Sequence, residues 1–292
     1  MDPQTIEDII LRNSRRGMEQ LRPYLPQRFC EQAARHILSW PRGAVLLATG
    51  FYVAGHAETD GPAGTVVLAK ALRKLGFSPC VLTDENCSRY FEPEGLDVIY
   101  MPYGGEESFS ARILEETAPV GMISVERCGR NVRGDYANMH GNSIRTHTAQ
   151  IDRLFDEAYG KVPTIGIGDG GNEIGMGNLA DVIAEKLSLV PCRTKVDDLV
   201  IAAVSNWGAY GIAAYLELLS GEAVFPDVSG VLAYLERTVS LGSVDGALEQ
   251  NVCSVDGYPL SESLEIYEAL RQAVAAYKDA ATSCTVPSGI RE

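Results

Sequence analysis

Short apolar segments alternate with amphipathic stretches along most of the chain. The apolar segments are rich in Val, Ile and Leu and are typical of strands buried on both faces of a parallel sheet. They lie at 44–48, 79–83, 97–101, 120–125, 163–168 and 198–204. The stretches between them predict helices at 65–75, 108–117, 147–159, 178–187 and 209–219. The pattern therefore predicts an α/β protein with a doubly wound, mostly parallel sheet, helices on both faces and a Rossmann-like arrangement.

The start of the chain has a different character. Residues 3–39 read as two helices interrupted by Pro23 and Pro26. We interpret residues 1–40 as a helical extension that packs over the sheet or serves a subunit contact in a homo-oligomer. Residues 41–292 then form a single α/β domain.

The part of that domain after residue 220 is expected to be helical. It encloses a loop in which the tetrapeptide SVDG occurs twice, at 243–246 and at 254–257. Two copies of four residues are too short for a repeat architecture, so we interpret them as two Asp-Gly turns.

Charge and composition exclude several classes of protein. The 292 residues carry a formal net charge of −14, which repels a phosphate backbone and argues against binding to nucleic acid. The apolar runs are far shorter than the roughly 20 residues of a membrane span, and the first residues lack a secretory pattern. Seven widely spaced cysteines without a C-x-x-C pair favour reduced thiols and a cytoplasmic location.

Polar and charged residues gather after the first, fourth, fifth and sixth predicted strands. In an open α/β sheet these segments meet at one edge, outside the carboxyl ends of the strands, where ligands bind. The side chains concerned are Glu58, Asp60, Glu126, Arg127, Arg130, Arg133, Asp135, Asn138, His140, Asn142, Asp169, Asn172, Glu173, Asn206 and Trp207. Two of the loops are much longer than is usual in such units, which favours a binding site over plain solvated connections.

A glycine-rich loop follows the fifth strand. Gly166, Gly168 and Gly171 match the G-x-G-x-x-G pattern of dinucleotide-binding loops, but Asp169 and Glu173 give the loop two carboxylates and no basic residue. Two uncompensated acids would repel a bare pyrophosphate. A ligand with charges of both signs, such as an amino acid, or a ligand bound through a divalent metal fits the loop better.

Three arginines, Arg127, Arg130 and Arg133, add a cationic edge suited to carboxylate recognition, although each could equally form an ordinary surface ion pair. The pair His140 and His147 is weak evidence for a zinc site. Motifs of serine hydrolases, P-loop nucleotidases and zincins are absent from the sequence.

Four segments carry a resemblance to a known family. The sequences ETDGPAG (58–64), ERCGRNVRGDYANMHGNSI (126–144), GIGDGGNEIGMGN (166–178) and SNWGAYG (205–211) resemble the C-terminal cyclase-like domain of the D-glutamate cyclase family, here in a stand-alone form. The resemblance extends from about residue 40 to about residue 260. It implies a lyase that interconverts D-glutamate and 5-oxo-D-proline with gain or loss of water.

This chemistry assigns expected roles to the collected residues. The expected catalytic residues are Asp60 and Glu126 for proton transfer, and Asp169 and Glu173 for binding the amine or a divalent cation such as Mg²⁺ or Mn²⁺. The expected substrate-binding residues are Arg127, Arg130, Gly168, Gly170, Gly171, Asn172 and Asn206. Two other classes stay open: a non-catalytic binder of an acidic amino acid, and a metal-dependent enzyme that acts on a phosphorylated metabolite.

Overall fold

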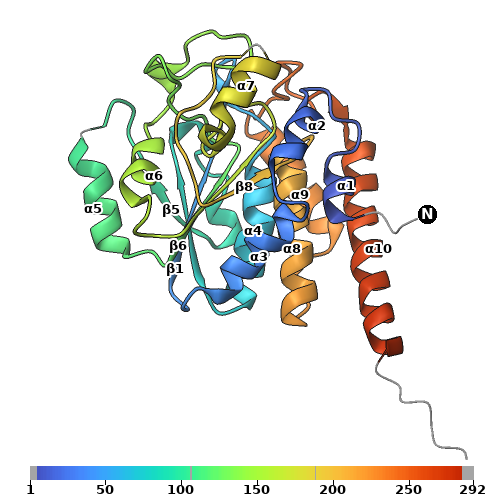
Figure 1. Ribbon diagram of the computed structural model, residues 1–292. Helices are drawn as coiled ribbons and strands as arrows, with labels where there is room; N and C mark the ends of the chain where they lie inside the picture. The colour runs from blue at the N-terminus through green and yellow to red at the C-terminus, as the bar shows by residue number, and fades with distance from the viewer. Residues whose placement is uncertain (1–4, 106, 188, 285–292) are drawn as a thin grey trace, which may run out of the picture.

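The computed structural model describes residues 5–105, 107–187 and 189–284 (Figure 1). Its centre is a six-stranded sheet in the order β5-β4-β1-β6-β7-β8, and every neighbouring pair is parallel. The strands are β1 (Ala44–Thr49), β4 (Ser78–Thr83), β5 (Asp97–Tyr100), β6 (Gly121–Val125), β7 (Thr164–Gly168) and β8 (Asp198–Ile201). The predicted α/β class and parallel sheet are therefore confirmed.

The strand order has a direct consequence for ligand binding. The chain builds the sheet outward from β1 to β5 and then returns to continue on the other side from β6 to β8. The switch between these two directions lies between β1 and β6, and a doubly wound sheet binds its ligand in the crevice above such a point. The loops after β1 and β6 therefore flank the expected site.

Helices cover both faces of the sheet (Figure 1). On one face lie α3 (Phe29–Ser39), α4 (Pro62–Lys74) and α8 (Ser205–Ser220), which contact the strands, and α8 packs against both α3 and α4. The opposite face carries α5 (Glu107–Thr117) and α6 (Asp152–Ala158).

An outer layer of helices packs on this arrangement. Helix α8 is contacted by α1 (Ile6–Ile10) and α10 (Leu260–Cys284), while α9 (Val228–Ser240) lies against α4. Near the carboxyl ends of the strands, α2 (Met18–Leu21) contacts α7 (Ala180–Lys186). The remaining elements are β2 (Tyr52–Val53), β3 (His56–Ala57), β9 (Ser254–Val255), β10 (Tyr258–Pro259), and the 3-10 turns Arg22–Tyr24, Glu85–Cys87, Glu92–Glu94, Arg145–His147 and Met176–Leu179.

The two largest differences between predicted and observed helix starts are at α8 and α6. Helix α8 starts at Ser205 rather than at residue 209, because the Asp60 carboxylate accepts hydrogen bonds from the backbone amides of Ser205 and Asn206. Helix α6 starts at Asp152 rather than at residue 147, because the backbone amide and carbonyl of Ala149 are held by Asp84 and Arg127. Both shifts are tertiary effects.

One hydrophobic core joins the ends of the chain to the sheet. It includes Ile6, Ile10 and Phe29 from the N-terminal helices and Leu270 from α10, all nearly fully buried. Residues 1–40, which we expected to form an extension, therefore share the core of the domain as far as they are described. None of the helices in the described ranges has the length and apolar character that crossing a membrane requires.

Candidate active site

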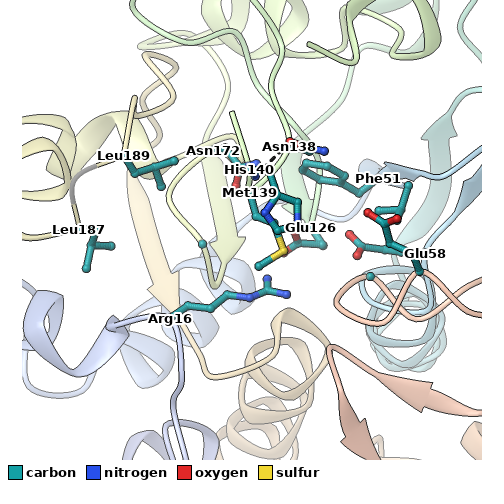
Figure 2. Close-up of a pocket in the computed structure, with 14 residues that line it drawn as sticks. Arg16, Phe51, Glu58, Glu126, Asn138, Met139, His140, Asn172, Leu187 and Leu189 are labelled. Atoms are coloured by element: carbon teal, nitrogen blue, oxygen red, sulfur yellow. Dashed lines mark hydrogen bonds between the residues drawn. The ribbon is translucent and has the colours of Figure 1, made fainter. Parts of the chain in front are cut away.

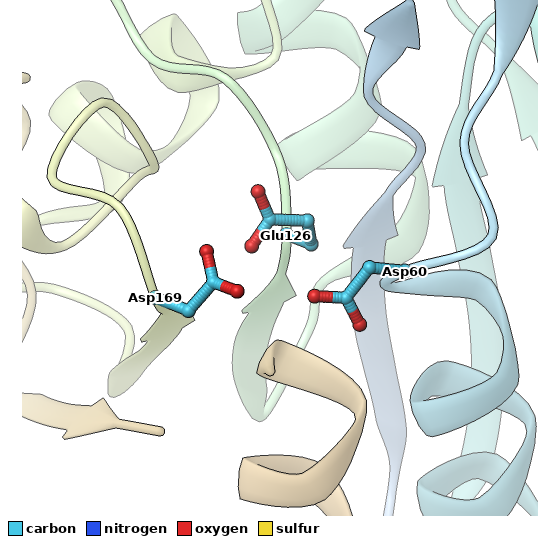
Figure 3. Close-up of side chains that lie close together, drawn as sticks. All are labelled: Asp60, Glu126 and Asp169. Carbon is cyan, nitrogen blue, oxygen red and sulfur yellow. The ribbon is translucent and has the colours of Figure 1, made fainter. Parts of the chain in front are cut away.

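Three carboxylates converge at the carboxyl edge of the sheet. Asp60 lies in the segment after β1, Glu126 directly follows β6 and Asp169 directly follows β7. One oxygen from each lies within 4.8 Å of the others, and the three side chains point toward one another (Figure 3). The predicted gathering of these residues at one edge is observed.

Backbone amides hold Asp60 in place. Its Oδ1 accepts hydrogen bonds from the amides of Gly61 (2.9 Å) and Asn206 (2.7 Å), and its Oδ2 accepts one from the amide of Ser205 (2.8 Å). These contacts join the first turn of α4 to the first turn of α8. Asp60 is fully buried, so its orientation is fixed by the fold.

Glu126 is positioned by its backbone and by one hydroxyl. Its φ is +47°, a left-handed conformation uncommon for a residue with a side chain, and it turns the chain sharply at the end of β6. The Ser205 hydroxyl donates a hydrogen bond of 2.5 Å to Oε2 of Glu126. Oε1 of Glu126 accepts no hydrogen bond from any described residue and can therefore act as an acceptor or a metal ligand.

Asp169 contacts an arginine that sequence reasoning missed. Arg16 lies between α1 and α2, in the segment we interpreted as a helical extension, and its Nη1 lies 2.7 Å from Oδ1 of Asp169. Its Nη2 lies 2.6 Å from Oδ1 of Asp256. Oδ2 of Asp169 is buried and has no hydrogen-bond partner within the described part of the chain.

Two further acids, Glu58 and Asp256, belong to the same site. Asp256 lies in the second SVDG segment, whose turn directs its carboxylate to Arg16. A Cβ placed on Gly246, in the first SVDG segment, would lie 1.8 Å from Oε2 of Glu58 and 3.0 Å from Oδ1 of Asp256. The two turns therefore bring these acids together, which a local interpretation of SVDG as turns did not predict.

Burial governs the ionisation of this cluster. Burial, together with the nearby charges of Asp256 and Asp60, raises the pKa of Glu58 well above its usual range. The pKa values of Asp60, Glu126 and Asp169 are raised in the same direction, first by burial and then by neighbouring acids, and Arg16 opposes the rise at Asp169. The site thus favours bound protons or a bound cation.

A cavity of about 220 Å³ opens beside the cluster (Figure 2). Arg16, Glu58 and Glu126 line it, together with Asn172 and residues of the loop around His140. Asp60 and Asp169 lie behind this lining. The size suits a small metabolite rather than a dinucleotide.

The backbone amides of the glycine loop form hydrogen bonds within the loop itself. The amide of Gly170 donates to Oε1 of Glu173 (2.7 Å) and that of Gly171 to Oε2 (2.6 Å), so Glu173 braces the loop from within. Gly171 has a φ of +114°, a conformation that side chains disfavour. Glu173 thus occupies the two amides that we expected to bind substrate, and it is itself held within the loop rather than directed to an amine or a metal. Gly170 nevertheless lines the cavity, as expected of a substrate-binding residue.

The remaining predicted residues of this loop have simpler roles. A Cβ on Gly168 would lie 3.0 Å from the Glu173 carboxylate, so the glycine permits the close packing of the loop on β7. The Asn172 side-chain amide donates to the carbonyl of Ala137 (2.8 Å) and also lines the cavity. Asn172 is thus placed to contact a ligand.

The two arginines expected to bind the substrate have partners in the structure. Arg127 is 1% exposed, and its Nη2 lies 2.6 Å from Oδ2 of Asp84, so it is an internal ion-pair residue. Arg130 pairs with Asp156 (3.0 Å) and lies 3.7 Å from Asp152. Neither lines the cavity, because each guanidinium is held by acids of neighbouring segments.

Asn206 is also structural rather than ligand-facing. Its Oδ1 accepts hydrogen bonds from the amides of Gly61 and Gly64, and its side-chain nitrogen donates to the carbonyl of Thr59. It therefore fixes the start of α4 beside Asp60 and does not line the main cavity.

The three converging carboxylates fit a hard divalent cation. Mg²⁺ and Mn²⁺ prefer carboxylate oxygens, and two oxygens on opposite sides of Mg²⁺ lie about 4.2 Å apart, close to the size of this cluster. The unpartnered buried oxygen of Asp169 is a suitable donor, and Glu126 and Asp60 each offer a carboxylate oxygen beside it. Asp60, Glu126 and Asp169 are the residues that would hold such an ion.

Fold and site define the class of the protein: a doubly wound α/β protein with an acidic cavity at the switch point of its sheet. The chain belongs to the family described as "D-glutamate cyclase-like, C-terminal", whose model matches residues 6–271. The predicted family is therefore confirmed.

Known proteins give two comparisons. The human protein named "D-glutamate cyclase, mitochondrial" is 31% identical over 208 residues, which are 62% of this chain and 34% of that protein. The aligned region thus spans about a third of the length of the curated relative. A solved exopolyphosphatase-related protein from Bacteroides fragilis is 9% identical, with a TM-score of 0.42, over 85% of this chain and 57% of that one.

Proposed function

We propose that this protein is a lyase that interconverts D-glutamate and 5-oxo-D-proline plus water. We further propose that Asp60, Glu126 and Asp169 hold one Mg²⁺ or Mn²⁺ ion in the active form. The observation that carries the proposal is the convergence of these three buried carboxylates beside a small cavity, in a chain of the D-glutamate cyclase-like family.

The charge balance of the cavity supports the metal. D-Glutamate carries two carboxylates and one ammonium group, whereas Glu58, Glu126, Asp169 and Asp256 surround a single guanidinium, that of Arg16. The ammonium group suits these acids, but the substrate carboxylates would be repelled. A bound divalent cation would offset that repulsion and polarise the carboxyl group under attack.

Glu58 is the best-placed residue for proton transfer. Ring closure forms a bond between the substrate nitrogen and its γ-carboxyl carbon, while one γ-oxygen leaves as water. The two protons lost by the ammonium group are the two that the leaving oxygen gains, so one carboxyl that exchanges protons can carry both transfers. Glu58 lines the cavity, and burial raises the pKa of its carboxyl well above the usual range, which favours the protonated form.

This assignment revises the expected roles. Asp60 and Glu126 were expected to transfer protons, but amides and the Ser205 hydroxyl orient them toward Asp169, which suits cation ligands. Glu58 takes the proton-transfer role in the proposal.

Proton NMR of the purified protein with Mg²⁺ tests the reaction. We expect D-glutamate and 5-oxo-D-proline to approach the same equilibrium mixture from both sides. Glu58→Gln should lower turnover by at least about 100-fold, the usual contribution of a general acid–base residue. Glu7→Gln is the matched control, because Glu7 is a buried glutamate of raised pKa that lies in the hydrophobic core near Tyr215.

The same experiment separates the alternatives. An absence of turnover from either substrate, with both Mg²⁺ and Mn²⁺ supplied, would overturn the proposed reaction. If D-glutamate nevertheless raised the melting temperature, the protein would be a non-catalytic binder of an acidic amino acid.

A further inference from the structure

The carboxylate cluster beside the cavity contains more acids than one divalent cation needs. Beyond Asp60, Glu126 and Asp169 lie Glu58 and Asp256, whose facing oxygens are both close to Gly246. The Asp256 side chain is 1% exposed, and its Oδ2 is buried without a hydrogen-bond partner within the described ranges. The Glu58 carboxylate likewise accepts no hydrogen bond from the described residues. These open oxygens form a second set of possible cation ligands.

Arg16 lies between the two sets. Its guanidinium bridges Asp169 of the first set and Asp256 of the second, at 2.7 and 2.6 Å. Figure 2 shows its side chain extending into the site near Glu126 and Glu58. A positive charge at this position neutralises part of the second set and repels any cation that approaches it.

Neighbouring contacts fix the backbone that carries Arg16. The Arg15 guanidinium lies 3.9 Å from the centre of the Tyr258 ring and donates to the carbonyl of Gly257. The Tyr258 hydroxyl in turn donates to the carbonyl of Asn13 (2.6 Å). The segment 13–16 is thus attached to the turn that contains Asp256, and Arg16 is a built-in part of the site.

We propose that Arg16 acts as a covalently attached counter-cation that limits the carboxylate cluster to one divalent ion. It occupies the place that a second ion would take between Asp169 and Asp256. The inference deepens the proposed function and rests on its metal site. Arg16 is a positioning residue in this scheme, since it acts through the charges of the acids.

The number of Mn²⁺ ions bound per chain tests this directly. Metal-free protein is titrated with Mn²⁺, and free ion is measured by its electron paramagnetic resonance signal. We expect one ion per chain for the wild type and two for Arg16→Met, with the magnetic coupling of a close Mn²⁺ pair in the variant. Arg35→Met is the control, because it removes an exposed guanidinium that pairs with Glu31 on α3, and it should keep one ion.

A second substitution identifies the added site. Adding Asp256→Asn to Arg16→Met should return the stoichiometry to one, and Arg16→Lys should keep it at one because the charge remains. Melting curves establish that each variant is folded. A stoichiometry of two ions per wild-type chain would overturn the inference, and this measurement does not depend on the folding of any variant. A stoichiometry of one ion per chain for a folded Arg16→Met protein would overturn it as well.

Stoichiometry and turnover give separate answers. A wild-type protein that binds one Mn²⁺ but does not turn over D-glutamate would refute the proposed reaction and leave the role of Arg16 standing. A wild-type protein that binds no Mn²⁺ would refute both the metal site and this inference.

Discussion

The substitution Asp169→Asn tests whether the acidic loop serves a cation or only the fold. The two side chains have nearly the same shape, and asparagine keeps one oxygen while it removes the negative charge. In the structure, Oδ1 of Asp169 contacts Arg16 and Oδ2 is buried without a partner. If the proposed cation site is correct, the charge matters more than the shape.

The structure sets the size of the expected effects. A unit charge about 4 Å from another, at an effective dielectric constant of about 20, contributes about 4 kcal/mol, which corresponds to roughly a 1000-fold loss of Mn²⁺ affinity. Stability should change little, because Arg16 keeps its contact with Asp256 and the repulsion between Asp169 and Asp60 is removed. We expect the free energy of unfolding to shift by no more than about 1 kcal/mol, or a few degrees in melting temperature.

Three measurements on the same preparation check this: Mn²⁺ titration, NMR of the substrate mixture and a melting curve. Asp198→Asn is the control, because Asp198 is a buried aspartate at the opposite end of the sheet, where it accepts a hydrogen bond from Gln32. The control should bind Mn²⁺ and turn over substrate like the wild type. An Asp169→Asn protein with wild-type affinity and turnover would refute the cation site and make Asp169 a structural residue.

Two other predictions concern stability. Asp84→Asn should cost about 3–5 kcal/mol in the free energy of unfolding, measured by urea denaturation, because it leaves the buried Arg127 charge uncompensated; a loss below about 1 kcal/mol would contradict the internal role of Arg127. The pKa values of Glu58, Glu126 and Asp169 are raised in the folded protein, so the folded state binds their protons more tightly than the unfolded state does. Their contribution to the free energy of unfolding is therefore complete below about pH 4 and is lost as the pH rises through the raised pKa values. The metal-free protein should therefore melt at a lower temperature at about pH 8 than at about pH 5.5, and Mg²⁺ should raise the melting temperature more at the higher pH; equal melting temperatures at both pH values would contradict the electrostatics of the site.

The sequence predicted those features that depend on local pattern. Apolar runs located all six strands of the sheet, and the rule for carboxyl ends of parallel strands correctly brought Asp60, Glu126 and Asp169 to one edge. The charges of the glycine pattern argued against a dinucleotide loop, and in the structure Glu173 occupies the amides of Gly170 and Gly171. The apolar pattern of each strand and the polar residues that directly follow it carry this information, because both are properties of short segments.

Roles that depend on long-range pairing could not be predicted in this way. Glu173 binds the amides two and three residues before it, and Arg127 pairs with Asp84, so the side chains with the most suggestive chemistry are used to hold the loops. Arg16 looked unremarkable in an N-terminal helical segment, yet packing of that segment beside the last β-turn brings its charge to Asp169. A buried acid cluster needs some positive partner. In the four predicted site segments, acidic residues outnumber basic ones. This excess was the sequence signal that positive charge comes from elsewhere in the chain or from a bound metal.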